Sequence, residues 1–214
     1  RSTRIETITN GYDDADISSY DERPQPFDKF TLYYMGNYKA SQNIDALWNA
    51  IAQLSAEYPD FSKSFRMLFI GNQTSDFKER LTSHGIAQLI DCEDFQEHHQ
   101  VIHKMMKSQM LFFPIPNVSE NKIILTGKIF EYLASKLPLL SIGPVDGEAA
   151  RVLKETARTA MLDYEDQAGV KIRILQNWKD WKALGHVPLI NNDFHKKYNR
   201  KDLAGRVAEI LSSL

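Results

Sequence analysis

Short apolar runs that end in glycine recur along the chain, at residues 31–36, 66–71 and 138–143. Further apolar runs occupy residues 86–91 and 110–114. Continuous apolar runs of this length are typical of strands that are buried on both faces, as in a parallel sheet. The pattern therefore predicts parallel strands at these positions.

Helical periodicity lies between the predicted strands. In residues 43–58, Ile44, Leu47, Ile51 and Leu54 follow one another at spacings of three or four, which places them on one helical face. Similar patterns predict helices at residues 77–83, 98–108, 126–135, 147–156, 167–181 and 200–214. Strands that alternate with helices predict an α/β fold with a doubly wound parallel sheet, which binds ligands at the carboxyl ends of its strands.

The first thirty residues carry a different pattern. Asp13, Asp14 and Asp16 form an acidic stretch, Pro24 and Pro26 follow it, and few aliphatic residues precede it. No folded element is predicted there, so residues 1–30 are interpreted as a linker. Because the chain begins with arginine, we expect it to be processed or to be a piece of a longer protein.

Composition excludes several classes of function. A formal net charge of −2 gives no electrostatic reason to expect nucleic acid as a partner. The 10 glycines include no G-x-G pair, which excludes dinucleotide fingerprints and P-loops. The single Cys92 excludes an intramolecular disulfide or a thiolate zinc cluster and indicates a reducing compartment, and no apolar run approaches the ~18 residues of a membrane span. We expect a cytoplasmic protein.

One segment, residues 126–144, combines a polar, glycine-containing helix start with a helix and a buried strand. The free N–H groups of a first helical turn attract anions. Thr126 is the predicted N-cap, Lys128 adds a positive charge, and Glu131 lies about one turn further along. On these residues alone, an anion site and a surface turn with solvated side chains are equally favoured.

Residues 131–138, Glu-Tyr-Leu-Ala-Ser-Lys-Leu-Pro, resemble the donor-binding helix of family-4 (group 1) glycosyltransferases of the GT-B architecture. Those enzymes have two Rossmann-like domains with the active site between them. Residues 8–13 are similar to the Asn-Gly-x-Asp turn that precedes the interdomain linker in that family. The resemblance implies a missing N-terminal acceptor-binding domain before residues 1–30, a donor domain at 31–195 and a crossover helix at 196–214.

The same resemblance implies roles for particular residues. Glu131 would bind the ribose of a nucleotide diphosphate sugar, and His98 would lie near its base. The diphosphate would meet Thr126, Gly127, Lys128, Gly36 and Lys39. The implied reaction transfers a sugar to a hydroxyl acceptor with retention, without a metal and without a cofactor besides the sugar nucleotide, in glycan or polysaccharide biosynthesis. Catalytic groups would lie in the missing domain.

Two positions depart from the family pattern. Ile123 stands where the first of two spaced glutamates is usual, and Lys39 is the only cation in the loop after the first strand, where an Arg and a Lys are usual. These departures indicate a divergent subgroup of the family, in which Lys128 would neutralise the charge of the diphosphate.

Other features have simpler interpretations. His99 and His103 stand at i and i+4, but Gln100 replaces the glutamate of a zinc-protease helix, so a solvated or partly buried pair is favoured over a metal site. Acidic residues at 146 and 148 favour a helix start, and Glu155 is interpreted as a solvated partner of a Lys or Arg.

Trp178 and Trp181 lie in a lysine-rich stretch, which allows contact with the inner face of a membrane but favours core packing. Two functional alternatives also stay open at this stage: a non-enzymatic flavodoxin-like or receiver-like signalling module, and a sugar-nucleotide epimerase of the same architecture.

Overall fold

The central feature of the fold is a parallel sheet. The structure is a computed structural model that describes residues 5–18 and 23–213. In this part of the chain, five parallel strands lie in the order β3-β2-β1-β4-β5. Their bounds are β1 Phe30–Met35, β2 Phe65–Ile70, β3 Ile90–Glu93, β4 Met110–Pro114 and β5 Leu139–Ile142. This is the doubly wound α/β arrangement that the sequence predicts, and the chain reverses its winding direction between β1 and β4.

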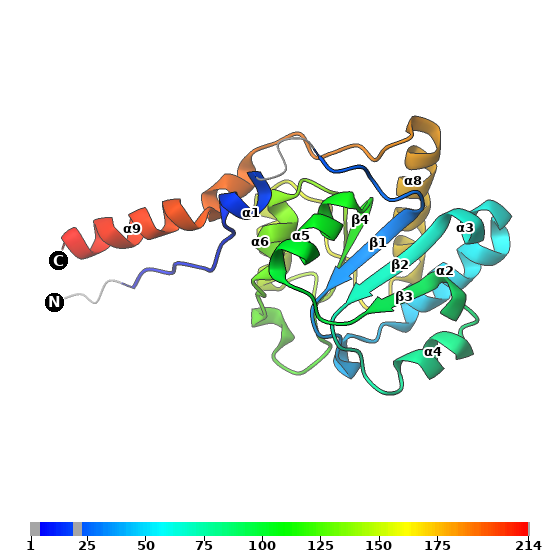
Figure 1. Cartoon of the computed structure of the whole chain (residues 1–214). Coiled ribbons are helices and arrows are strands. Elements are labelled where there is room, and N and C mark those ends of the chain that lie inside the picture. Colours follow the sequence, from blue (N-terminus) through cyan, green and yellow to red (C-terminus); the bar gives the residue numbers. More distant parts are fainter. Residues whose placement is uncertain (1–4, 19–22, 214) are drawn as a thin grey trace.

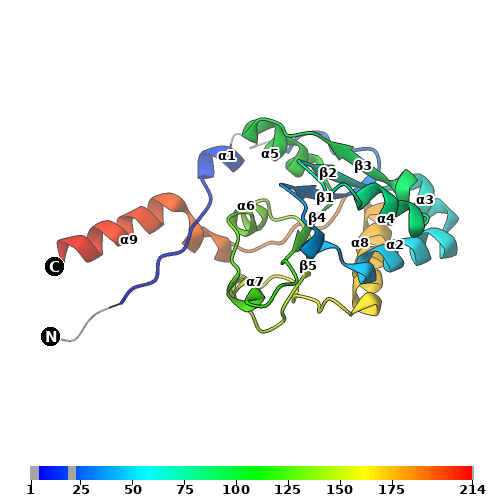
Figure 2. The ribbon, with the colours of Figure 1, turned by 90° about the horizontal axis from the view of Figure 1, so that it is seen from below.

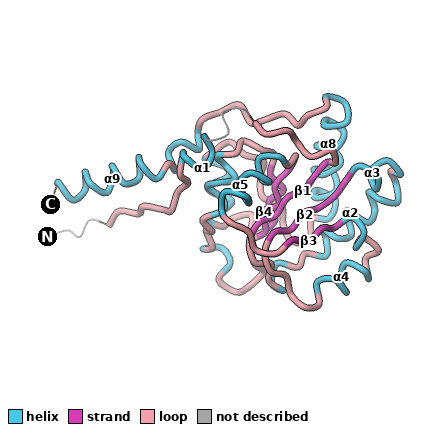
Figure 3. Tube along the Cα trace, viewed as in Figure 1, coloured by secondary structure: helices cyan, strands magenta, loops and turns pink. Residues whose placement is uncertain are grey.

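Helices cover both faces of the sheet, as Figures 1 and 2 show. In Figure 3 the strands form an inner layer with helices on either side. The helices are α1 Asp14–Ser18, α2 Asp45–Glu57, α3 Pro59–Ser64, α4 Phe77–Ser83, α5 His98–Lys107, α6 Lys128–Ala134, α7 Glu148–Glu155, α8 Gln167–Leu184 and α9 Arg200–Ser212. Helices α5 and α6 lie on one face, and α2 and α8 lie on the other.

Burial explains why the strands are apolar throughout. Every residue of β1 is buried, because neighbouring strands pair on both sides: Tyr33 is in register with Leu68 of β2 and with Leu111 of β4. Side chains of a strand alternate between the two faces, so both sets contact helices. The predicted strands at 31–36, 66–71, 110–114 and 138–143 match the structure to within about one residue.

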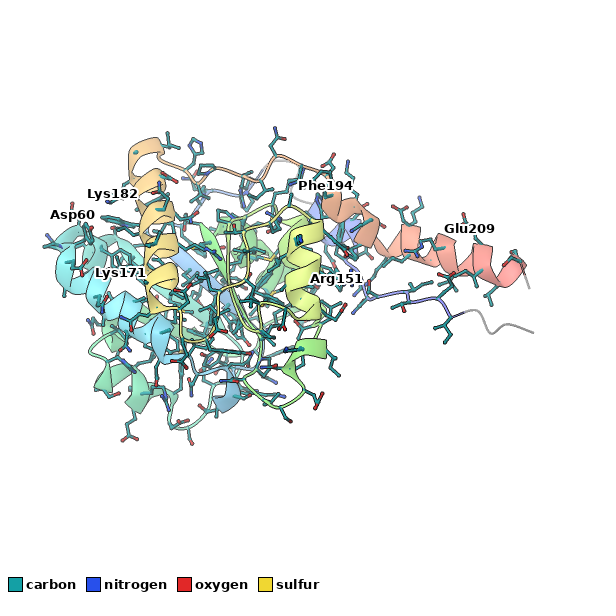
Figure 4. The ribbon with its side chains drawn as sticks, turned by 180° about the vertical axis from the view of Figure 1, so that it is seen from behind. Asp60, Arg151, Lys171, Lys182, Phe194 and Glu209 are labelled. Atoms are coloured by element: carbon teal, nitrogen blue, oxygen red, sulfur yellow. The ribbon has the colours of Figure 1, made fainter. Side chains whose placement is uncertain are left out.

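The layer behind the sheet contains the tryptophans. Helix α8 packs on α2, and Lys171 and Lys182 point toward α2 and α3 (Figure 4). Trp178 is buried, and its indole N–H donates to Ser64 Oγ at 3.0 Å. Trp181 is partly buried, with its ring 6.0 Å from that of Phe30. Core packing, the favoured interpretation, is confirmed for both tryptophans.

Two predicted elements differ from the structure. The strand predicted at 86–91 is a 3₁₀ turn over 87–89 followed by β3, because the edge strand exposes Asp91 and Cys92 and therefore lacks a continuous apolar signal. The first thirty residues, in which no folded element is predicted, contain the short helix α1. This helix forms because it packs against α5, far away in sequence.

The two ends of the described chain meet at one side of the domain. The N–H of Tyr12 donates to the carbonyl of Tyr198 at 3.1 Å, and Arg200 donates back to the carbonyl of Tyr12 at 3.0 Å. From this junction, the preceding N-terminal residues and α9 extend side by side away from the sheet (Figures 1 and 2). Among the described residues, none of the helices is long and apolar enough to span a membrane.

Candidate functional site

A pocket of about 440 Å³ opens at the carboxyl ends of β1 and β2. It is lined by Met35, Gly36, Asn37, Ile70, Gly71, Asn72, Phe95, Gln96, His98, Val101 and Lys128. These residues come from the ends of two central strands, from the start of α5 with its preceding loop, and from the start of α6. The pocket therefore lies beside the point at which the winding direction reverses, where doubly wound sheets bind their ligands.

Two strand-terminal glycines form the floor of this pocket. Gly36 and Gly71 have φ angles of +110° and +120°, which side chains with a Cβ atom rarely adopt. A Cβ on Gly71 would lie 2.8 Å from the carbonyl oxygen of Gly36, so the two loops approach each other closely only because both residues are glycine. Neither residue places a side chain in the pocket.

Lys128 supplies the positive charge of the pocket. It is the first residue of α6, yet its side chain reaches β1, where Nζ donates to Met35 O at 2.9 Å and to Tyr34 Oη at 3.1 Å. The ammonium group also lies 4.2 Å from the centre of the Tyr34 ring. Burial lowers the pKa of Lys128 from 10.5 to about 8, and nearby Glu131 partly offsets this effect.

The start of α6 differs from the predicted one. Gly127, not Thr126, is the N-cap residue, and the helix begins at Lys128. Thr126 does not cap the helix: its hydroxyl is buried and makes no hydrogen bond within the described part of the chain. A Cβ on Gly127 would lie 3.1 Å from the side-chain nitrogen of Asn10. The Asn10-Gly11 turn therefore covers part of this helix start.

Glu131 lies beside His98, as a shared site requires. The distance from His98 Nε2 to Glu131 Oε1 is 3.9 Å, and Asp16 Oδ2 of α1 lies 3.1 Å from the same nitrogen. Burial raises the pKa of Glu131, and the charge of Asp16 adds to this effect, while His98, Arg200 and Lys128 oppose it. Only 18% of the Glu131 side chain is exposed, so its carboxylate keeps limited access to solvent and ligand.

The structure therefore brings Gly36, Lys128 and His98 to the pocket, and Glu131 lies beside His98 without lining it. The other predicted site residues, Thr126, Gly127 and Lys39, lie outside the lining. Lys39 is also exposed. Gly143 ends β5 with the same sequence signature as Gly36, but it is buried: a Cβ there would lie 2.8 Å from Cβ of Ile115. Gly143 therefore serves close packing and does not face the pocket.

Several pocket residues were not singled out from the sequence. Asn37 and Asn72 each follow a strand-terminal glycine, and the N–H of Asn72 donates to the side-chain oxygen of Asn37 at 3.4 Å. The repeated Gly-Asn dipeptide after β1 and β2 is a signal that could have found them. Phe95, 81% exposed, and Gln96 lie in the loop before α5, where the sequence carries no periodic pattern.

Other candidate groups keep their structural interpretations. His99 and His103 are both exposed on α5. Within residues 5–18 and 23–213, no three His, Cys, Asp or Glu side chains gather to hold a metal ion. Glu155 pairs with Arg151 and Lys197, as expected for a solvated partner, and Asp146, just before α7, pairs with Lys122 at 2.6 Å.

Comparisons with known proteins bear on the fold. No family model matches the chain, and no curated protein sequence matches it. Solved glycosyltransferase structures do match. The pneumococcal O-GlcNAc transferase GtfA, in complex with UDP and GlcNAc, has a TM-score of 0.62 at 13% identity over 98% of this chain and 38% of its own.

Two further structures agree. A sucrose-phosphate synthase from Thermosynechococcus elongatus matches with a TM-score of 0.62 at 12% identity, over 96% of this chain and 51% of its own. A UDP-forming trehalose-phosphate synthase from Burkholderia vietnamiensis matches with a TM-score of 0.61 at 12% identity, over 96% of this chain and 51% of its own. The fold is that of one Rossmann-like half of GT-B glycosyltransferases, and the chain spans about half or less of these proteins.

Proposed function

We propose that the chain is the donor-binding domain of a glycosyltransferase that transfers a sugar from a nucleotide diphosphate sugar to a hydroxyl acceptor. Transfer with retention, without a metal ion and within glycan or polysaccharide biosynthesis belongs to the same proposal, as does membership of the family-4 (group 1) enzymes. The fold similarity supports sugar transfer at the general level, and the residues of the pocket support the donor.

One observation carries the proposal: the ammonium group of Lys128 lies next to the pocket glycine Gly36. A Cβ on Gly36 would be 3.2 Å from Lys128 Nζ, so the cation stands at the open end of β1. A diphosphate at this position would gain a charge-assisted hydrogen bond from the Lys128 ammonium group. Stabilisation of the leaving diphosphate in this way lowers the barrier to sugar transfer.

The remaining residue roles are part of the same proposal. Thr126 and Gly127 do not line the pocket and Asn10 lies against Gly127, so their backbone N–H groups would reach the diphosphate only if the Asn10-Gly11 turn moved aside. Glu131, beside His98, would accept hydrogen bonds from the ribose hydroxyls. His98 lines the pocket on the α5 side and would lie near the base. Lys39 would have to move inward to contribute, because its side chain lies outside the pocket.

We further propose that the donor domain comprises residues 31–195 and that its partner is an acceptor-binding domain in a longer protein. Helix α9 supports this, since Val207 and Leu211 are 40% and 64% exposed on a helix that extends away from the sheet (Figure 1). Apolar residues on such a helix favour burial against another domain. Residues 1–30 and 196–214 would be the connections between the two domains.

Calorimetric titration of this chain with UDP, GDP and ADP tests the donor site. We expect one nucleoside diphosphate to bind at micromolar to millimolar concentration and the Lys128→Met variant to bind it at least ~10-fold more weakly, because a charge-assisted hydrogen bond contributes about 1.5–3 kcal/mol. A matched control is Lys154→Met, which removes an exposed lysine on α7 outside the pocket. The absence of heat with all three nucleotides at millimolar concentration would contradict the proposal.

A further inference from the structure

We propose that Tyr34 is a positioning residue for the donor site, whose hydroxyl group orients the Lys128 ammonium toward the pocket and keeps it protonated. This inference rests on the proposed function of Lys128 as the ligand of the diphosphate. It concerns a side chain one layer below the pocket surface, which no ligand would touch.

The hydrogen bonds around Tyr34 fix the direction of its hydroxyl proton. The phenol oxygen lies 3.0 Å from the carbonyl oxygen of Asn37, and a carbonyl only accepts, so the Tyr34 proton must point there. Gln42 donates to the same phenol oxygen through Nε2 at 3.3 Å. The oxygen is thus left as an acceptor on the side that faces Lys128.

An ammonium group has three donors, and Tyr34 helps to direct them. Nζ of Lys128 donates to Tyr34 Oη and to Met35 O, two acceptors fixed on β1. Among the described residues these are the hydrogen-bond partners of Nζ, so the third N–H is left for a ligand in the pocket. A lysine side chain is otherwise flexible, with about 2 kcal/mol of rotamer entropy, so two fixed acceptors restrict it to the orientation that a ligand needs.

Tyr34 is itself held rigidly. Its ring is buried among Tyr38, Phe69 and Phe112, with centroid distances of 5.3, 5.3 and 6.0 Å. Gln42, which is also buried, connects it to the carbonyl of Pro114 on β4 at 3.5 Å. Burial raises the pKa of Tyr34 to about 12, so its hydroxyl keeps its proton throughout the neutral range.

Other groups near Lys128 do not replace this role. Glu131 lies on the same helix and favours the charged lysine, while His98 of α5 lines the pocket and pairs with Asp16 of α1. Arg200 at the start of α9 acts on Glu131. None of these makes a hydrogen bond to Nζ among the described residues. Loss of the Tyr34 acceptor should therefore make Lys128 lose its proton at a lower pH.

The test compares UDP affinity from pH 6 to 9 for the wild type, Tyr34→Phe and Tyr33→Phe. Tyr33→Phe is the matched control, because it removes a buried hydroxyl from the same strand that instead donates to Val101 O at 2.8 Å. The terminal phosphate of UDP also titrates near pH 6. The ratio of variant to wild-type affinity is therefore compared at each pH, since this cancels the titration of the ligand.

We expect Tyr34→Phe to bind UDP within about twofold of wild type at pH 6 and at least ~5-fold more weakly at pH 8, because less of its Lys128 is protonated there. Tyr33→Phe should keep a constant ratio to the wild type. A Tyr34→Phe ratio that equals one at every pH overturns the inference. A loss of affinity that is the same at every pH overturns the role of Tyr34 in keeping Lys128 protonated. If the wild type binds UDP in a Lys128-dependent way, either result leaves the proposed function intact, whereas a wild type that binds no nucleotide overturns both.

A second measurement does not depend on any ligand. The Lys128 side chain is titrated by NMR in the free protein, with Lys128→Met to assign its signal. The midpoint should lie near pH 8 in the wild type and at a lower pH in Tyr34→Phe. An unchanged midpoint overturns the inference.

Discussion

Gly36 and Lys128 lie next to each other although 91 residues separate them in the sequence: a Cβ added to Gly36 would lie 3.2 Å from Lys128 Nζ. This proximity makes the end of β1 and the start of α6 one site. Glycine is required at position 36 for two separate reasons. The backbone φ is +110°, and the ammonium group of Lys128 occupies the space that a side chain would need.

Gly36→Ala is expected to reduce both stability and nucleotide binding. The backbone conformation costs an alanine about 1–3 kcal/mol, and the new methyl group displaces the lysine. Gly85→Ala is the control: Gly85 has a φ of +68°, and an added Cβ meets nothing within 4 Å. This control should lower the melting temperature and leave UDP affinity unchanged. A Gly36→Ala variant with wild-type affinity for UDP would contradict the close approach of the two residues.

Lys128→Met is expected to be more stable than the wild type at neutral pH although it binds nucleotide poorly. The pKa of Lys128 is lower in the folded chain, about 8, than its ordinary 10.5, so folding must desolvate a charge at pH 7. We expect a gain of about 1–3 kcal/mol in the free energy of unfolding. Between pH 8 and 10.5 the folded wild type loses this proton before the unfolded chain does, so its stability rises relative to the variant. Urea unfolding at pH 7 and pH 10 measures the free energy of unfolding of the wild type and the variant. If the two proteins differ by the same amount at both pH values, protonation of Lys128 does not contribute to the stability difference.

Glu131→Gln is expected to discriminate between ligands. If Glu131 accepts hydrogen bonds from the ribose, the variant should bind UDP about 10–100-fold more weakly and bind inorganic pyrophosphate as well as the wild type. Because burial and Asp16 raise the pKa of Glu131, acidification should also weaken UDP binding by the wild type as this carboxylate takes up a proton. Glu148→Gln, on α7 outside the pocket, is the matched control. An equal loss of affinity for UDP and pyrophosphate would show that Glu131 does not act on the ribose.

Trp178 is expected to stabilise the core and not to contact lipid. Trp178→Ala should lower the free energy of unfolding by about 3–5 kcal/mol, since the ring is buried and lies 5.5 Å from that of Phe61. In co-sedimentation with anionic vesicles at low salt, the wild type and Lys179→Gln should remain equally in the supernatant. Sedimentation that depends on Lys179 would point to a surface role for this lysine-rich helix.

The apolar runs were sufficient to predict the central strands, because β1 and β2 are buried on both faces and carry only one polar residue each, Thr31 and Arg66. Burial also explains why the strand predicted at residues 86–91 does not match β3. This edge strand exposes Asp91 and Cys92, so its pattern is no longer that of a buried strand. Helix α1 has only five residues and depends on contact with α5, which no local pattern encodes.

The site was predicted only in part, because the sequence shows the spacing of residues within one element but not the contacts between elements. Lys128 and Glu131 lie on one helix, so their spacing could be read directly, and Gly36 follows from the strand-terminal position. Their contacts with Tyr34, His98 and Asp16 join β1, α5 and α1, and these depend on how the layers pack. Gly143 shows the limit of the glycine pattern, because it also ends a buried strand but packs against Ile115 and not beside the pocket.

The pairing of Tyr12 with Tyr198 and Arg200 has a consequence for synthesis of the chain. Elongation proceeds at about 5–20 residues per second, so the N-terminal segment leaves the ribosome seconds before the residues that bury Tyr12 exist. The two backbone hydrogen bonds of this junction can form only after residue 200 has emerged, so they join segments that are synthesised far apart in time.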